Sequence, residues 1–116
     1  MTLKYWLTPP DLAHEVAGRF DPTPWPRRVD WDALTEPWPK PWYLNPPFSQ
    51  AAAFTRKALA EGGPGTIIVP TTTPTQLLIE AEARIESLGR VRWLDCETKA
   101  PMPVSRAPPC ILARLE

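Results

Sequence analysis

The chain has 116 residues, which is enough for one compact domain (1–116) and too few for two. Its 43% of hydrophobic residues exclude a wholly disordered chain, and 13 basic residues balance 13 acidic ones, which excludes a global field that attracts nucleic acid. A nucleic-acid partner therefore requires a local basic patch or a specific pocket. With no apolar run of about 20 residues and no signal-peptide pattern, we expect no membrane partner and a cytoplasmic protein.

In chain order, the first expected element is a helix that Thr8 caps, that begins with Pro9 and Pro10, and that ends at Gly18. A short strand follows and ends at Asp21. Residues 22–41 are proline-rich and predict an irregular connection, and residues 41–45, PWYLN, predict a buried strand.

The second half of the chain alternates more clearly between helix and strand. Residues 49–61 predict a helix capped by Ser49 and stopped by Gly62. Residues 73–89 predict another, capped by Thr73 or Thr75. Further strands are expected at residues 65–70, 90–96 and 110–116, with a loop over 97–109. This order indicates an α/β fold with a mostly parallel sheet flanked by helices.

Ligands of such sheets bind beyond the carboxyl ends of the strands. Three expected strand ends, at Asp21, Asn45 and Pro70, should therefore face one crevice. The 17 prolines and six tryptophans of the chain leave two interpretations of its first half open. The tryptophans either pack against prolines as structural elements or line a pocket for a flat ligand.

Asn45-Pro46-Pro47-Phe48 predicts a rigid corner, since proline fixes its own backbone and cannot donate to a sheet. The Asn45 amide and the Pro46 carbonyl offer two acceptors that suit an exocyclic amino group. Phe48 offers a face on which a base turned out of its duplex can stack. Two acceptors on the amino protons push electron density onto the nitrogen, so an electrophilic methyl group held in line would be attacked. A strand-to-helix turn without chemistry is the alternative.

This corner matches the Asn/Asp/Ser-Pro-Pro-aromatic motif of S-adenosylmethionine-dependent amino methyltransferases of DNA, and the chain resembles the compact, phage-type DNA N-6-adenine methyltransferases. WLTPPDL (6–12), FDPTPW (20–25), VDWDALTEPW (29–38), IIVPTTT (67–73) and VRWLD (91–95) resemble successive family segments. The resemblance implies a minimal Rossmann-like, class I methyltransferase-like sheet, truncated relative to the full fold. A glycine-rich turn after the first strand, and a region for target recognition, are lacking in this chain.

The resemblance also implies roles for individual residues. The catalytic corner would be Asn45, Pro46, Pro47 and Phe48. S-adenosyl-L-methionine would be bound by Trp6, Thr8, Pro9, Asp21, Asp30 and Asp32. Ser49 would add a hydrogen bond to the DNA substrate. Independently of the resemblance, the charges of Arg27, Arg28 and Arg56 make them candidate phosphate contacts, with ordinary solvated positions as the alternative.

Other interpretations stay open at this point. Transfer to the 4-amino group of cytosine needs the same corner, and a decayed scaffold that only binds DNA or protein fits the missing glycine turn. A homodimer is a further hypothesis. His14 is expected to be structural, and Cys96 and Cys110 lack metal-ligand spacing, so we expect reduced thiols and no metal site.

Overall fold

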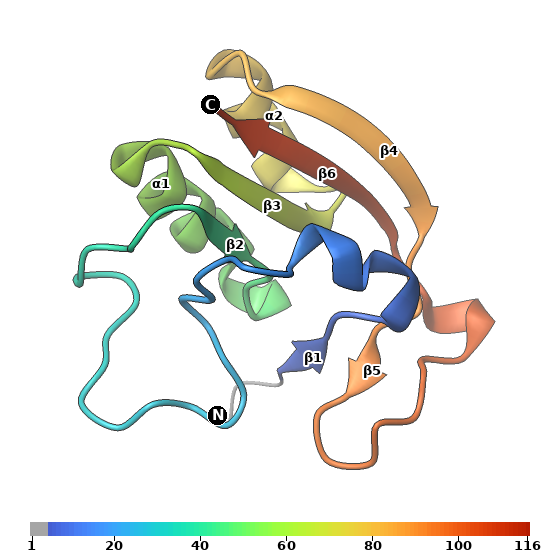
Figure 1. Ribbon diagram of the computed structural model, residues 1–116. Helices are drawn as coiled ribbons and strands as arrows, with labels where there is room; N and C mark the ends of the chain where they lie inside the picture. Colours follow the sequence, from blue (N-terminus) through green and yellow to red (C-terminus); the bar gives the residue numbers. More distant parts are fainter. Residues whose placement is uncertain (1–4) are drawn as a thin grey trace.

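A four-stranded mixed sheet forms the centre of the molecule, in the strand order β2-β3-β6-β4 (Figure 1). The computed structural model describes residues 5–116, apart from the side chain of Thr73. The strands of this sheet are β2 (Trp42–Leu44), β3 (Gly65–Pro70), β4 (Arg84–Arg90) and β6 (Pro109–Leu115). A second, two-stranded sheet pairs β1 (Trp6–Leu7) with β5 (Leu94–Asp95).

The expectation of a mostly parallel sheet is wrong at the level of strand pairs. β2 and β3 are parallel, whereas β6 is antiparallel to both of its neighbours, β3 and β4. The reason is topological, because β6 reaches the sheet through a long loop and not through a right-handed helical crossover. The parallel part therefore lies at one side of an α/β fold, where Phe20 adds an isolated parallel bridge to Trp42.

Helices α1 (Ala51–Glu61) and α2 (Thr73–Glu80) follow β2 and β3, and three short 3-10 helices complete the described helical elements: η1 (Pro10–Glu15), η2 (Phe48–Gln50) and η3 (Val104–Arg106). The predicted capping residues are wrong. Pro9 is the N-cap of η1, Gln50 that of α1 and Thr72 that of α2. The stop at Gly62 is confirmed, since this residue has a φ of 75° and donates its N–H to Ala58.

The helix predicted over residues 73–89 is wrong beyond Glu80. The backbone turns at Glu82, which has a φ of 59°, and β4 follows instead. β4 pairs with β6 from Arg84 to Arg90, so hydrogen bonding to a distant strand overrides the local helical propensity of this segment. The strand predicted over 90–96 shrinks to the two residues of β5.

Alternate residues of the central strands enter two separate hydrophobic cores. Along β3, Ile67 and Val69 pack in one cluster with residues of α1 and α2, whereas Ile68 packs in the other with Trp93 and Leu12 of η1. The same alternation along β2 sends Tyr43 to the η1 side. Both faces of the sheet are thereby covered, as an apolar strand such as β3 requires.

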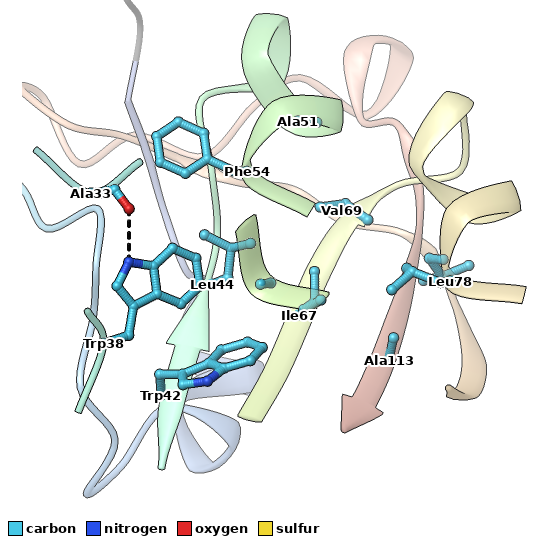
Figure 2. Packing of buried hydrophobic residues seen from close by; sticks show 12 residues of the cluster. Ala33, Trp38, Trp42, Leu44, Ala51, Phe54, Ile67, Val69, Leu78 and Ala113 are labelled. Carbon is cyan, nitrogen blue, oxygen red and sulfur yellow. Dashed lines mark hydrogen bonds between the residues drawn. The ribbon is translucent and has the colours of Figure 1, made fainter. Parts of the chain in front are cut away.

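The irregular connection over residues 22–41 is confirmed, and it is anchored in the core by a tryptophan. The Trp38 indole is 3% exposed and donates its Nε1–H to the Ala33 carbonyl at 2.8 Å (Figure 2). Its ring meets that of Trp42 edge-on at 5.3 Å. These two tryptophans are structural packing elements, whereas Trp31, in the same connection, lines a surface pocket.

Candidate functional site

The residues that follow Phe20, β2 and β3 lie at the same end of the sheet, because these three segments are parallel and their carboxyl ends meet there. The residues concerned are Asp21, Asn45 and Thr71. Thr23 joins the first two. Its N–H donates to the Asp21 carboxylate at 2.9 Å, and its hydroxyl donates to the Asn45 carbonyl at 3.0 Å. Thr71, by contrast, is exposed and donates its N–H to Pro109.

The side-chain amide of Asn45 is held in one orientation. Its Nδ2 donates to the carbonyl of Trp6 at 2.6 Å, so the oxygen points away from that bond. This Oδ1 is buried and has no hydrogen-bond partner among the residues that the structure describes. A buried acceptor without a partner costs about 1–3 kcal/mol. Four other buried side-chain atoms also lack a partner among the described residues: Thr55 Oγ1, Thr66 Oγ1, Thr75 Oγ1 and Trp93 Nε1. Asn45 Oδ1 is set apart by its place after the carboxyl end of β2, where a ligand of an α/β sheet is expected to supply the donor.

The two prolines of the corner are buried and give it a fixed backbone. Neither Pro46 nor Pro47 has an N–H, and the Pro47 carbonyl accepts the N–H of Gln50 at 2.9 Å, which starts η2. Phe48 is partly buried, and its ring meets that of Trp93 edge-on at 5.9 Å. The backbone of the corner is therefore restrained by two prolines and a turn, and the core contacts the Phe48 ring on one side.

Thr8 contributes to this site instead of capping η1. Its hydroxyl shares a hydrogen bond of 2.7 Å with the hydroxyl of Tyr43, a strand residue whose pKa burial raises. Pro9 is buried beside it, and Trp6 contacts Asn45 as described. The N-terminal segment 6–9 thus lies against the carboxyl end of β2. The structure brings this predicted cofactor-binding segment to the predicted catalytic corner.

The three predicted aspartates have different environments. Asp21 lies close to the corner, where burial raises its pKa and the hydrogen bonds from Thr23 oppose that shift. Asp30 is exposed, with a left-handed φ of 59°. The Asp32 carboxylate accepts the N–H of Leu34 at 3.0 Å. Only Asp21 is joined to Asn45, through Thr23; Asp30 and Asp32 belong to the 22–41 connection.

A surface cavity of about 380 Å³, here called the loop pocket, lies between the 22–41 connection and the start of α1. Thr23 lines it as well as contacting Asn45, so the pocket borders the corner. Its lining consists of Tyr5, Pro22, Thr23, Pro24, Arg27, Arg28, Trp31, Asp32, Ala33, Leu34, Gln50 and Phe54.

The predicted substrate-binding residues are divided between different places. Arg27 and Arg28 line the loop pocket, whereas Ser49 is exposed on η2 and Arg56 is exposed on α1. The sequence interpretation missed Thr23 and Tyr43. The Asp-Pro-Thr order of residues 21–23 is the signal that could have identified Thr23, because Asp side chains accept the N–H two residues on. No local signal links Tyr43 to Thr8.

Within residues 5–116, no helix is long and apolar enough to cross a membrane. The same residues contain no group of three or more His, Cys, Asp or Glu side chains arranged to hold a metal ion. Comparison of the chain with protein-family models, with curated proteins and with solved structures finds no match.

Proposed function

We propose that this protein transfers a methyl group from S-adenosyl-L-methionine to the 6-amino group of adenine in DNA. The observation that carries the proposal is the buried Asn45 Oδ1, which lacks a donor and whose direction is fixed by the bond from Nδ2 to Trp6. An exocyclic amino group supplies the missing donor. In this proposal the mixed sheet is a truncated Rossmann-like sheet of the class I methyltransferase type, in which β2 and β3 keep the parallel part.

The corner acts on the amino group by accepting hydrogen bonds from it. Asn45 Oδ1 accepts a hydrogen bond from one N–H and the Pro46 carbonyl accepts one from the other, which raises the electron density on the nitrogen and orients its lone pair. When bound, S-adenosyl-L-methionine supplies an electrophilic methyl group. The rigidity given by Pro46 and Pro47 keeps both acceptors in place, so positioning contributes most of the acceleration.

The residues near the corner suit a cationic cofactor. Asp21 is a carboxylate whose ionised form is disfavoured by burial, and a positive charge beside it would relieve that cost. S-adenosyl-L-methionine carries a sulfonium and an ammonium group. Trp6, Thr8 and Pro9 line the approach to the same place. We assign Asp21 to the cofactor and leave Asp30 and Asp32 outside this site.

Because Asn45 Oδ1 is shielded, the substrate must displace part of its cover. The segment next to it is β1, which pairs with β5 over two residues only. Such a short pairing opens at low cost. Access to the corner is therefore proposed to involve a transient movement of residues 6–9, after which the bond from Asn45 Nδ2 to the Trp6 carbonyl forms again and orients Oδ1 toward the bound amino group. That the protein is located in the cytoplasm and that it forms a homodimer are predictions that these observations do not bear on.

The test is methyl transfer from labelled S-adenosyl-L-methionine to unmethylated DNA, single-stranded and duplex, followed by digestion and identification of the labelled nucleoside. We expect label in N6-methyladenine, its loss in Asn45→Ala, and partial retention in Asn45→Asp, which keeps the acceptor oxygens. Gln76→Ala is the matched amide control, since Gln76 is exposed on α2 and bonds to Glu80.

Each other outcome supports a different function for this protein. Label in N4-methylcytosine would select the cytosine alternative. No label on either DNA, together with no cofactor binding by calorimetry in the presence of DNA, would refute the proposed reaction and favour a non-catalytic binding module.

A further inference from the structure

The loop pocket is suited to an anionic ligand. Its charged side chains are Arg27, Arg28 and Asp32, and neither arginine forms an ion pair with a described carboxylate. The Asp32 carboxylate is already engaged by the N–H of Leu34. S-adenosyl-L-methionine, whose sulfonium and ammonium groups outweigh its single carboxylate, matches two arginines poorly. The pocket therefore favours a phosphate over the cofactor.

Arg28 is held in place for such a ligand. Its guanidinium carbon lies 4.9 Å from the centroid of the Trp31 ring. Trp31 is itself fixed by its Nε1–H, which donates to the Pro22 carbonyl at 2.9 Å, and by an edge-on contact with Phe20 at 5.6 Å. A guanidinium that is ordered in advance loses less conformational entropy when it binds a phosphate.

Tyr5, Trp31 and Phe54 are the aromatic side chains that line the pocket with these cations, and Trp25 lies next to it. Trp25 is 37% exposed and packs on Tyr5, a residue of the pocket, with a centroid distance of 5.6 Å. Val29, 87% exposed, projects from the same loop. Positive charge next to aromatic rings is the arrangement that binds unpaired nucleotides, because the rings stack on bases while the cations follow the phosphates. Bases inside a duplex cannot stack in this way.

The pocket and the corner share Thr23, which lines the first and hydrogen-bonds to Asn45 in the second. A cavity of about 380 Å³ is of the size that takes one nucleotide. A nucleotide bound there would lie next to the base held at Asn45. Such a nucleotide site would supply the target-recognition region that the sequence lacks.

We propose that the loop pocket binds one unpaired nucleotide beside the target adenine, with Arg27 and Arg28 on its phosphate and Trp25 on its base, so that the substrate is single-stranded DNA. The choice of DNA as the polyanion rests on the proposed function.

The test measures the binding of a fluorescently labelled DNA single strand of about 12 nucleotides. Binding is monitored by fluorescence anisotropy, without cofactor, at a series of salt concentrations. We expect the single strand to bind at least tenfold more tightly than its duplex. Arg27→Ala should weaken binding about tenfold and lower the slope of log K against log salt by about 0.7–1. Among residues 5–116 Arg27 has no cation–π contact, so we expect this variant to keep the fold even if Arg28→Ala does not. Arg106→Ala, exposed on η3, is the matched control.

Several outcomes would overturn the inference. These are unchanged binding by a folded Arg27→Ala, tighter binding of the duplex or of RNA of the same sequence, and loss of S-adenosyl-L-methionine binding in the arginine variants with DNA binding intact. Binding of the single strand through Arg27 without any methyl transfer would support the inference and refute the proposed function, so the two failures are distinguishable.

Discussion

Replacing Asn45 by leucine, which has nearly the same shape, separates a functional amide from a structural one. The substitution removes the bond from Nδ2 to the Trp6 carbonyl, whose net contribution is about 0.5–1.5 kcal/mol. It also removes the buried, unpartnered Oδ1, which costs about 1–3 kcal/mol. We therefore expect the free energy of unfolding to lie between about 0.5 kcal/mol lower and about 2.5 kcal/mol higher than that of the wild type, while methyl transfer is lost.

The assay is urea denaturation followed by tryptophan fluorescence, with Thr8→Val as the comparison. Thr8→Val also removes one polar group, but it leaves the hydroxyl of the buried Tyr43 without its 2.7 Å partner. This variant should lose about 1–3 kcal/mol. If Asn45→Leu is destabilised as much as Thr8→Val, the amide is a structural group and the reasoning from its free acceptor is refuted.

Three further predictions concern the sheet, the carboxylate near the corner and a thiol. In Gly65→Ala the added methyl group clashes with the Trp42 indole, so the free energy of unfolding should fall by about 3 kcal/mol. In a double-mutant cycle measured by denaturation, Trp42→Phe should restore part of this loss. If the effects of the two substitutions simply add, the contact is contradicted. Because burial raises the pKa of Asp21 above its ordinary value of 3.8, native protein binds this proton more tightly than unfolded protein, and the stability of the wild type falls as the pH rises above that value. Asp21→Asn should therefore gain stability relative to the wild type as the pH rises through this range, and a constant difference would argue against the shift. Burial raises the pKa of Cys110 to about 11, so its thiol should react with a disulfide reagent at pH 8 only as fast as the protein unfolds, and rapid labelling identified by mass spectrometry would show an open site.

Local patterns in the sequence predicted the elements whose causes are local. The alanine-rich run before Gly62 forms α1, and the apolar run of β3 is buried on both faces. The buried strand β2 ends before the corner at Asn45 because the two prolines that follow have no N–H to donate to a sheet.

Features that depend on residues far away in the chain could not be predicted from local sequence patterns. The direction of β6 is fixed by its neighbours in the sheet, and residues 84–90 become a strand because β6 offers them hydrogen bonds. Thr8 carries a good capping pattern, but its partner is Tyr43, 35 residues away. The orientation of the Asn45 amide likewise depends on a carbonyl 39 residues earlier, so the motif indicated the site without indicating which atom is left unpaired.

The central position of β6 affects the order in which the molecule can assemble. β3 and β4 precede β6 in the chain, yet they do not pair with each other and are joined only through it. Until β6 docks, both strands present unpaired backbone edges, and the contacts that close the sheet span long stretches of chain. We expect slow folding for a protein of this size, and a growing or partly folded chain that is prone to associate through the edge of β3.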